Sequence, residues 1–196
     1  MRLLLCTPIP VLAAACLRSP TASAQIADAL RGRRPVALAE GPNTVDLLHD
    51  ARPDLVLRGW VENFNAHGFH YITFYVQYPD SSSGATRWDL VPFLTSDQRL
   101  DGFSTARGAD CVLRDLRVLE STGQPHMPAV VVTAERDFGS AYTDSTRVVF
   151  SLYELRTNVT GAPGQPGIAF VHSESVTARG VYCDVNVAFA AELGIP

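Results

Sequence analysis

Apolar residues recur at every second position, or in short unbroken runs, through most of the chain after residue 40. These segments are rich in Val, Ile, Phe, Tyr and Thr and are bounded by Gly, Pro, Asp or Ser, which is typical of β-strands. The pattern predicts eight strands, at Thr44–Leu47, Leu55–Val61, Phe69–Tyr78, Trp88–Phe93, Cys111–Leu119, Ala129–Glu135, Arg147–Asn158 and Ile168–Thr177. The Gly- and Pro-rich stretch Gly161–Gly167 predicts a hairpin tip between the last two strands.

The pattern changes near the end of the chain, where Val185, Ala188, Phe189 and Leu193 fall on one helical face behind the capping residue Asp184. Ile26 to Leu30 predicts a further short helical turn. Together these elements predict a mainly β fold, an antiparallel β-sandwich or bent sheet with one short C-terminal helix. Because no linker or shift in composition divides residues 25–196, we expect a single domain.

The first 24 residues have the pattern of a signal peptide. Met1-Arg2 supplies a basic start, Leu3–Leu17 is largely apolar, and Ala22-Ser23-Ala24 is a small-x-small cleavage site. The apolar run is too short to span a membrane. An alternative interpretation is that Cys16 lies in a poor lipobox and becomes a lipid anchor. Both interpretations place the mature domain outside the cytoplasm, either periplasmic or secreted, or tethered to a membrane as a lipoprotein.

Cleavage after Ala24 leaves two cysteines, Cys111 and Cys183. In an oxidising compartment such a pair predicts one disulfide bond. The bond would close a loop of roughly 70 residues, which stabilises a fold by on the order of 4 kcal/mol in the chain-entropy picture.

The chain contains no lysine, so all 16 of its basic residues are arginine. This composition excludes the mechanisms that need a lysine, namely Ser-x-x-Lys acyl-enzymes, Schiff-base chemistry and Walker A phosphate binding. The mature domain carries an excess of carboxylates over arginines and no basic run. We therefore expect no nucleic-acid partner.

The sequence offers weak candidates for metal binding and catalysis. Asp46, Asp50 and Asp54 resemble the calcium loop of FG-GAP repeats, but Leu48 and Ala51 stand where that loop has a carboxylate and a glycine. We expect the three aspartates to cap backbone amides, with calcium binding as the alternative. No Gly-x-Ser-x-Gly motif is present, and neighbouring residues of the segment His172–Ser175 are expected to point to opposite faces of a strand. We expect no cofactor and no enzymatic activity.

A dense polar run between two strands supplies the candidate binding residues Glu62, Asn63, Asn65 and His67. Such a run marks a shaped turn or a site. Arg114 and Arg117 follow on a later strand, and an arginine fork near the turn would receive a carboxylate in bidentate fashion. Alternation predicts that Asp115 and Arg117 point the same way.

These features together resemble the bacterial carbapenem self-resistance (CarG-like) proteins. The resemblance covers Gly41–Glu120 and rests on Val45-Asp46-Leu47, Asp54-Leu55-Val56, the run Glu62–His67, Thr73-Phe74-Tyr75-Val76, Val91-Pro92-Phe93, Gly108-Ala109-Asp110-Cys111 and Leu113–Arg117. It implies a periplasmic protein that protects against carbapenems without β-lactamase motifs, by non-covalent binding of a β-lactam or a cell-wall-associated target. The alternative is a cell-envelope module for protein–protein interaction with an unrelated role.

Overall fold

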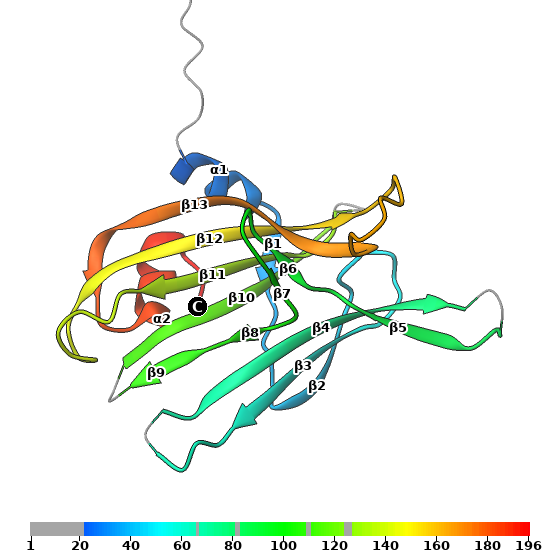
Figure 1. The fold of residues 1–196 in the computed structure, drawn as a ribbon. Coiled ribbons are helices and arrows are strands. Elements are labelled where there is room, and N and C mark those ends of the chain that lie inside the picture. The colour runs from blue at the N-terminus through cyan, green and yellow to red at the C-terminus, as the bar shows by residue number, and fades with distance from the viewer. Residues whose placement is uncertain (1–21, 66, 81–82, 109–110, 124–126) are drawn as a thin grey trace, which may run out of the picture.

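Two mainly antiparallel sheets packed face to face form the body of the protein (Figure 1). The computed structural model describes residues 22–65, 67–80, 83–108, 111–123 and 127–196. Most of the expected signal peptide, Cys16 and the Ala109-Asp110 part of the resemblance lie outside these residues. The predicted mainly β fold with a short C-terminal helix is confirmed.

The smaller sheet is built from strands of the first half of the chain. Its strands β2 (Gly41–Val45), β3 (Asp54–Val61), β4 (Phe69–Pro79) and β5 (Thr86–Leu90) are neighbours in that order, and β8 (Phe103–Ser104) also pairs with β4. The β4–β5 hairpin projects away from the larger sheet (Figure 1).

The larger sheet holds the longest strands. Its order is β1 (Arg33–Pro35), β10 (Cys111–Ser121), β11 (Val130–Arg136), β12 (Thr146–Thr157), β13 (Ile168–Tyr182), β6 (Phe93–Leu94) and β7 (Arg99–Leu100), and β9 (Ala106–Gly108) also pairs with β10. All pairs are antiparallel except that of β13 and β6, which is parallel. The predicted hairpin tip between the last two long strands is confirmed.

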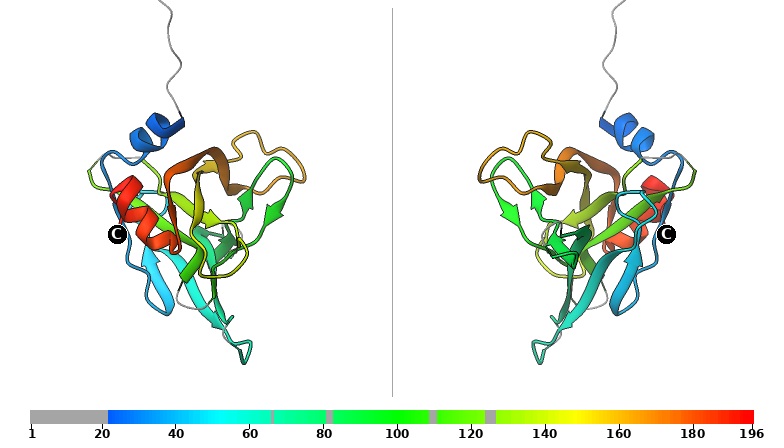
Figure 2. Two further views of the ribbon diagram at one scale, coloured as in Figure 1. Left: turned by 90° about the vertical axis from the view of Figure 1, so that its left-hand side faces the viewer. Right: turned by 90° about the vertical axis from the view of Figure 1, so that its right-hand side faces the viewer.

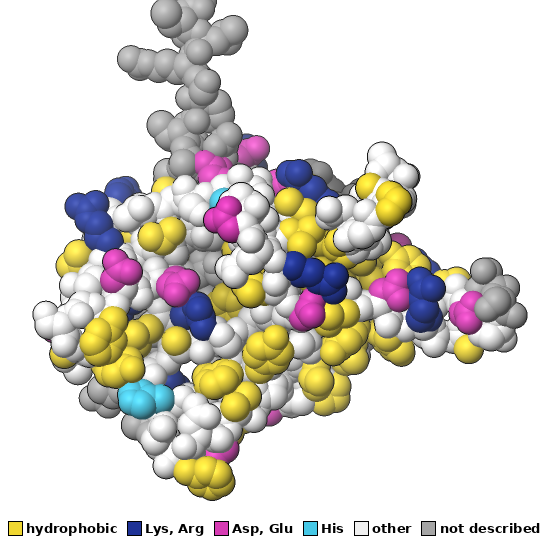
Figure 3. All heavy atoms as spheres, viewed as in Figure 1, with side chains coloured by type: hydrophobic (Ala, Val, Ile, Leu, Met, Phe, Trp, Pro, Cys, Tyr) yellow, Lys and Arg dark blue, Asp and Glu magenta, His cyan; other side chains and the backbone are white. Residues whose placement is uncertain are grey.

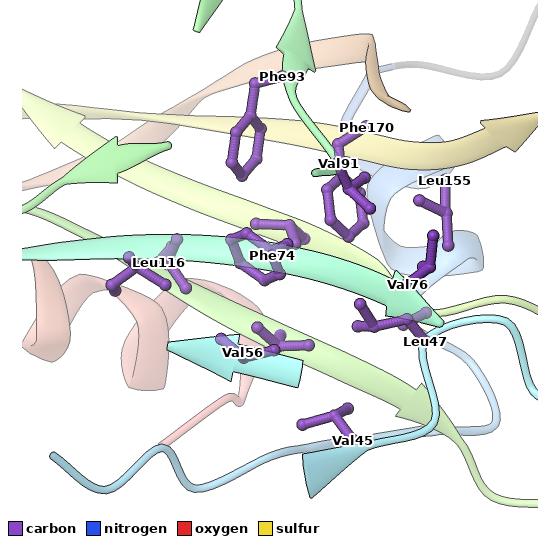
Figure 4. Close-up of a cluster of buried hydrophobic side chains, with 14 of the residues drawn as sticks. Val45, Leu47, Val56, Phe74, Val76, Val91, Phe93, Leu116, Leu155 and Phe170 are labelled. Atoms are coloured by element: carbon purple, nitrogen blue, oxygen red, sulfur yellow. The ribbon is translucent and has the colours of Figure 1, made fainter. Parts of the chain in front are cut away.

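The main core fills the space between the two sheets. Strand alternation directs Val56, Phe74 and Val76 inward from the smaller sheet, where they meet Leu116 and Phe170 from the larger one (Figure 4). The rings of Phe74, Phe93 and Phe170 pack together with centroid separations of 5.1 to 5.5 Å. Each such side chain stabilises the fold by about 1.5–3 kcal/mol through burial.

A second core lies on the opposite face of the larger sheet, under the helices α1 (Ala22–Ala29), α2 (Val185–Ala188) and the π-helical turn η1 (Phe189–Leu193). Ile26, Val185 and Phe189 are fully buried there against β11 and β12. Asp184 caps α2 by accepting a hydrogen bond from the Asn186 amide at 2.7 Å, as the sequence predicts. Figure 2 shows the C-terminal helix in red beneath the blue α1.

The predicted strand Trp88–Phe93 is wrong, because this segment divides between the two sheets. The Val91 amide donates to Phe74 in the smaller sheet at 2.8 Å, and the Pro92 carbonyl accepts from Phe170 in the larger sheet at 2.9 Å. The chain therefore changes sheets across one peptide. Proline suits this crossing because it has no N–H to offer to a ladder.

The predicted disulfide between Cys111 and Cys183 is present, with the two Cα atoms 5.6 Å apart. It joins the first residue of β10 to the residue before the cap of α2. The start of β10 and the segment that leads into α2 are therefore linked covalently.

Glu192 of η1 gives the C-terminal helix a pH-dependent attachment to β13. Its carboxylate accepts hydrogen bonds from the Gly180 amide at 2.9 Å, the Tyr182 hydroxyl at 2.8 Å and the Arg179 guanidinium at 3.1 Å. These bonds, chiefly that from Gly180, lower the pKa of Glu192 from 4.5 to about 2.

Because the pKa is lower in the folded state, Glu192 stabilises the protein above pH 4.5, and this contribution is lost as the pH falls toward about 2. At neutral pH, Glu192→Gln is expected to have a lower melting temperature than the natural protein. This difference in melting temperature is expected to disappear as the pH falls between these two values. A gap that stays constant down to the lower pH would contradict the assignment.

Candidate functional site

The inner face of the larger sheet extends beyond the core and lines a pocket. On β11, the alternation of side chains places Thr133 and Glu135 on the same face as the core residue Val131. On β12, it places Ser151 on the same face as Leu155. Beyond the core, this face forms the floor of a pocket of about 630 Å³. The aromatic side chains of its walls come from β4, β6, β8 and β12, and are Tyr71, Phe93, Phe103 and Tyr153.

A second pocket of about 350 Å³ adjoins the first, and both are lined by Ser104 and Arg114. The aromatic residues of the second pocket are His67, Phe69, Phe138 and Tyr142. We call the two pockets the Arg114 groove, with a larger and a smaller lobe. On the side of the molecule shown in Figure 3, hydrophobic side chains lie among adjacent basic and acidic ones.

Arg114 lies where the lobes meet, and β8 fixes its orientation. Its Nε donates to the Ser104 carbonyl at 2.7 Å, and its Nη2 donates to the Ser104 hydroxyl at 2.6 Å. The Phe103 ring centroid is 5.6 Å from the guanidinium carbon. Because a guanidinium has five N–H groups and Ser104 takes two, the fork keeps donors for an acidic ligand.

Glu135 is the acidic neighbour of this fork. Its Oε1 lies 3.6 Å from Nη1 of Arg114, and the carboxylate is largely exposed. Such an exposed pair contributes little to stability, so a ligand carboxylate can replace Glu135 at small cost.

His67 connects the turn after β3 to the groove. Its ring centroid is 4.8 Å from that of Tyr142, which in turn packs edge-on against Phe138 at 4.3 Å. Its Nδ1 lies 3.5 Å from the Arg107 carbonyl. His67 and Arg114, both predicted from the sequence as binding residues, thus line the same lobe.

The other predicted residues of this turn form its internal hydrogen bonds. Glu62 accepts from the Phe64 amide at 2.6 Å and from the Trp60 indole at 3.1 Å. Asn63 donates to the His67 carbonyl at 3.0 Å, and Asn65 accepts from the His67 amide at 2.8 Å. The structure therefore gives Glu62, Asn63 and Asn65 a turn-shaping role.

Arg117 lies on the opposite face of β10 from Arg114, where it bonds to other residues of the fold. It donates to the Leu116 carbonyl at 2.9 Å, to the Asp115 carboxylate at 3.0 Å and to the Pro196 carbonyl at 2.7 Å. The Leu116 amide donates to Asp115 at 2.9 Å. Leu116 lies between the parts of β10 that pair with β1 and β9, so these two side chains satisfy its backbone at that gap.

Asp46, Asp50 and Asp54 also bond to the backbone. Asp46 accepts from the Asp50 and Ala51 amides, and Asp50 accepts from the Arg52 amide, each at 3.0 Å. The buried Asp54 accepts from Leu47 at 3.0 Å and from Gln77 at 3.1 Å, although burial raises its pKa. Within the described part of the chain, no three His, Cys, Asp or Glu side chains gather where they would hold a metal ion.

The predicted alternation along His172–Ser175 is wrong after Ser173. A β-bulge opposite Leu152 and Tyr153 adds a residue to β13, so that His172 and Ser175 share a face. The Ser175 hydroxyl lies 2.8 Å from His172 Nε2 and 2.8 Å from the Ser151 hydroxyl, which lines the groove. The bulge was not evident from the sequence, because residue type alone did not mark it.

The fold of this chain is CarG-like. The crystal structure of CarG matches this chain with a TM-score of 0.64, covering 80% of this chain and 94% of CarG at 22% sequence identity. No family model and no curated protein matches the sequence. The resemblance seen in the sequence is thus confirmed as a relationship of fold.

The smaller lobe depends on Gly108, since a Cβ there would lie 2.3 Å from the Tyr142 ring. Gly108→Ala is expected to displace that ring from His67 and to lower the free energy of unfolding by about 1–3 kcal/mol. Denaturant unfolding would measure the loss. Gly123→Ala is the matched control, because a Cβ there meets nothing within 4 Å. Equal effects of the two substitutions would contradict the packing described.

Proposed function

We propose that this protein is an exported, non-enzymatic binding protein that holds a carboxylated ligand, either a β-lactam or a cell-wall-associated target, in the Arg114 groove. The observation that carries the proposal is the position of Arg114, whose oriented fork lies between two lobes lined by aromatic rings. An arginine fork matches the planar geometry of a carboxylate.

The shape and lining of the groove support a small organic ligand. Its larger lobe, at about 630 Å³, falls within the range of about 300–1,000 Å³ that is typical of ligand pockets. Such pockets combine apolar walls with a few placed polar groups, and Tyr71, Phe103 and Arg114 supply both kinds. The resemblance to carbapenem self-resistance proteins supports a β-lactam as the ligand, because carbapenems carry a carboxylate.

Export is supported by the signal-like start of the sequence and by the disulfide between Cys111 and Cys183, since such bonds persist in oxidising compartments. Among the described residues, no helix has the length and apolar character needed to cross a membrane.

The binding proposal predicts that a carbapenem or a soluble muropeptide raises the melting temperature of the exported protein in a saturable way, because only native-state binding stabilises by this route. Arg114→Ala is expected to abolish the shift. Arg114→Lys keeps the charge but loses the fork, and is expected to weaken binding about tenfold.

Arg87→Ala is the matched control, since Arg87 pairs with Asp89 at 2.7 Å on β5 and lies outside the lining of the groove. An unchanged shift in Arg114→Ala would place the ligand elsewhere. No shift with either probe would remove the small-ligand proposal.

The non-enzymatic part of the proposal predicts no saturable turnover of a carbapenem, a chromogenic cephalosporin or a p-nitrophenyl ester. The hydrogen-bonded set of Ser151, Ser175 and His172 is the arrangement best suited to contradict this prediction. Turnover that is lost in Ser175→Ala and kept in Ser173→Ala, with both variants folded, would make the protein a hydrolase.

A further inference from the structure

The hairpin tip between β3 and β4 presents one aromatic side chain to solvent. We define the β3–β4 tip as Glu62, Asn63, Phe64, Asn65 and His67. Phe64 is 95% exposed, whereas Phe74, Phe93, Phe150, Phe170 and Phe189 are all buried. The Phe64 ring therefore contributes almost nothing to the stability of the fold through burial.

Phe64 also adopts a backbone conformation that suits it poorly. Its φ is +55°, in the left-handed region, where a bulky residue is disfavoured and Gly or Asn is tolerated. Asparagine stands on both sides of it in the sequence, yet the phenylalanine occupies the left-handed position. An unfavourable conformation held at a fixed place is a recurring feature of functional sites.

The polar side chains of the tip hold Phe64 in that conformation. Glu62 accepts from the Phe64 amide at 2.6 Å, while Asn63 and Asn65 bond to the backbone of His67 at 3.0 and 2.8 Å. The ring is thus exposed on a restrained backbone, so that little conformational freedom remains to be lost on binding.

Trp60 adds a second held aromatic surface to the same hairpin. Its side chain is 44% exposed, and its indole donates to Glu62 at 3.1 Å. The ring lies over Gly68, where a Cβ would come within 2.3 Å of it. Rigid aromatic side chains of this kind dominate the energetics of protein–protein interfaces.

We propose that the β3–β4 tip inserts Phe64 into an apolar cavity of a partner protein that carries basic groups at the cavity rim, opposite Glu62. Phe64 itself does not line the Arg114 groove. Phe64 points into solvent, and of the tip residues only His67 lines the groove.

The charge of the tip favours a protein partner over an anionic lipid surface. Residues 60–67 contain no arginine or lysine. The hydrogen bonds from Trp60 and Phe64 lower the pKa of Glu62, so it remains a carboxylate at neutral pH. Anionic membranes repel such a group, while a basic rim on a protein attracts it.

The test begins with a benzophenone amino acid placed at position 64 of the exported protein in cells, and at position 159 as the control. Val159 is 88% exposed and lies in another hairpin, so it matches Phe64 in exposure. The adduct formed at position 64 alone is identified by mass spectrometry, and the captured protein is purified. Its affinity is then measured by calorimetry for the natural protein, Phe64→Asn and Val159→Asn.

Phe64→Asn is expected to weaken binding about thirtyfold or more, as for an interface hot spot, while Val159→Asn leaves it unchanged. Glu62→Gln is expected to weaken binding and to reduce its dependence on salt. The melting temperature of Phe64→Asn is expected to equal or exceed that of the natural protein, because asparagine tolerates the left-handed conformation.

Four results would overturn the proposal. They are equal capture at positions 64 and 159, unchanged affinity in Phe64→Asn, a lower melting temperature in that variant, and no adduct at position 64.

Binding to phosphatidylethanolamine–phosphatidylglycerol vesicles that Phe64→Asn abolishes would replace the protein partner with a membrane. Self-association in sedimentation that the same variant abolishes would replace it with a second copy of the chain. The melting shift assigned to Arg114 is independent of all these outcomes.

Discussion

Burial of the larger sheet on both faces is the constraint on which the rest of the structure depends. Val130, Val131 and Val132 are consecutive and all buried, so that one side chain enters the main core and its two neighbours enter the second core. A strand of this kind needs a cover on each side. The smaller sheet covers one face, and α1 with the C-terminal helix covers the other. The Arg114 groove lies where the inner face continues beyond the core into polar residues.

Arginine side chains connect these layers in a chain that has no lysine. Arg136 is only 4% exposed, and it donates to the carbonyls of Cys183, Asp137 and Tyr142. It thereby ties the loop that carries Phe138 and Tyr142 to the residue that forms the disulfide. Because a guanidinium has five donors in a fixed plane, one arginine can hold three carbonyls in this way, which an ammonium on a flexible stem does less specifically. The loop that lines the smaller lobe is therefore held by a buried guanidinium.

Periodicity in the sequence was sufficient to predict most long strands, the hairpin after β12 and the capped C-terminal helix. It was insufficient at Val91-Pro92, because a local pattern shows that a segment is extended but does not show which sheet it joins. Strands β1, β7, β8 and β9 have two or three residues each, too few to show any alternation. The bulge at Ser173 in β13 reversed the faces expected for Glu174 and Ser175, since one inserted residue changes the face of every residue after it.

The candidate site was predictable only where chemistry identified single residues. His67 and Arg114 stood out as groups able to bind an acidic ligand, and both line the groove. Arg117 had the same chemistry, but the three-residue spacing on a strand puts it on the other face, where the fold uses it. The aromatic walls come from strands far apart in the sequence, so no local pattern groups Phe103 with Tyr153. The conformation of Phe64 was hidden as well, because a positive φ at a bulky residue follows from the hydrogen bonds around it and not from its type.

His67 belongs to both surfaces of this protein. Its amide and carbonyl bond to Asn65 and Asn63 in the β3–β4 tip, and its ring packs on Tyr142 in the smaller lobe. A substitution at His67 therefore changes both surfaces together and distinguishes neither. Arg114 is held by Ser104, and Phe64 extends into solvent, so each can be removed without touching the contacts of the other. For this reason the functions of the groove and of the tip are separable at these two residues, although the hairpin and the groove meet at His67.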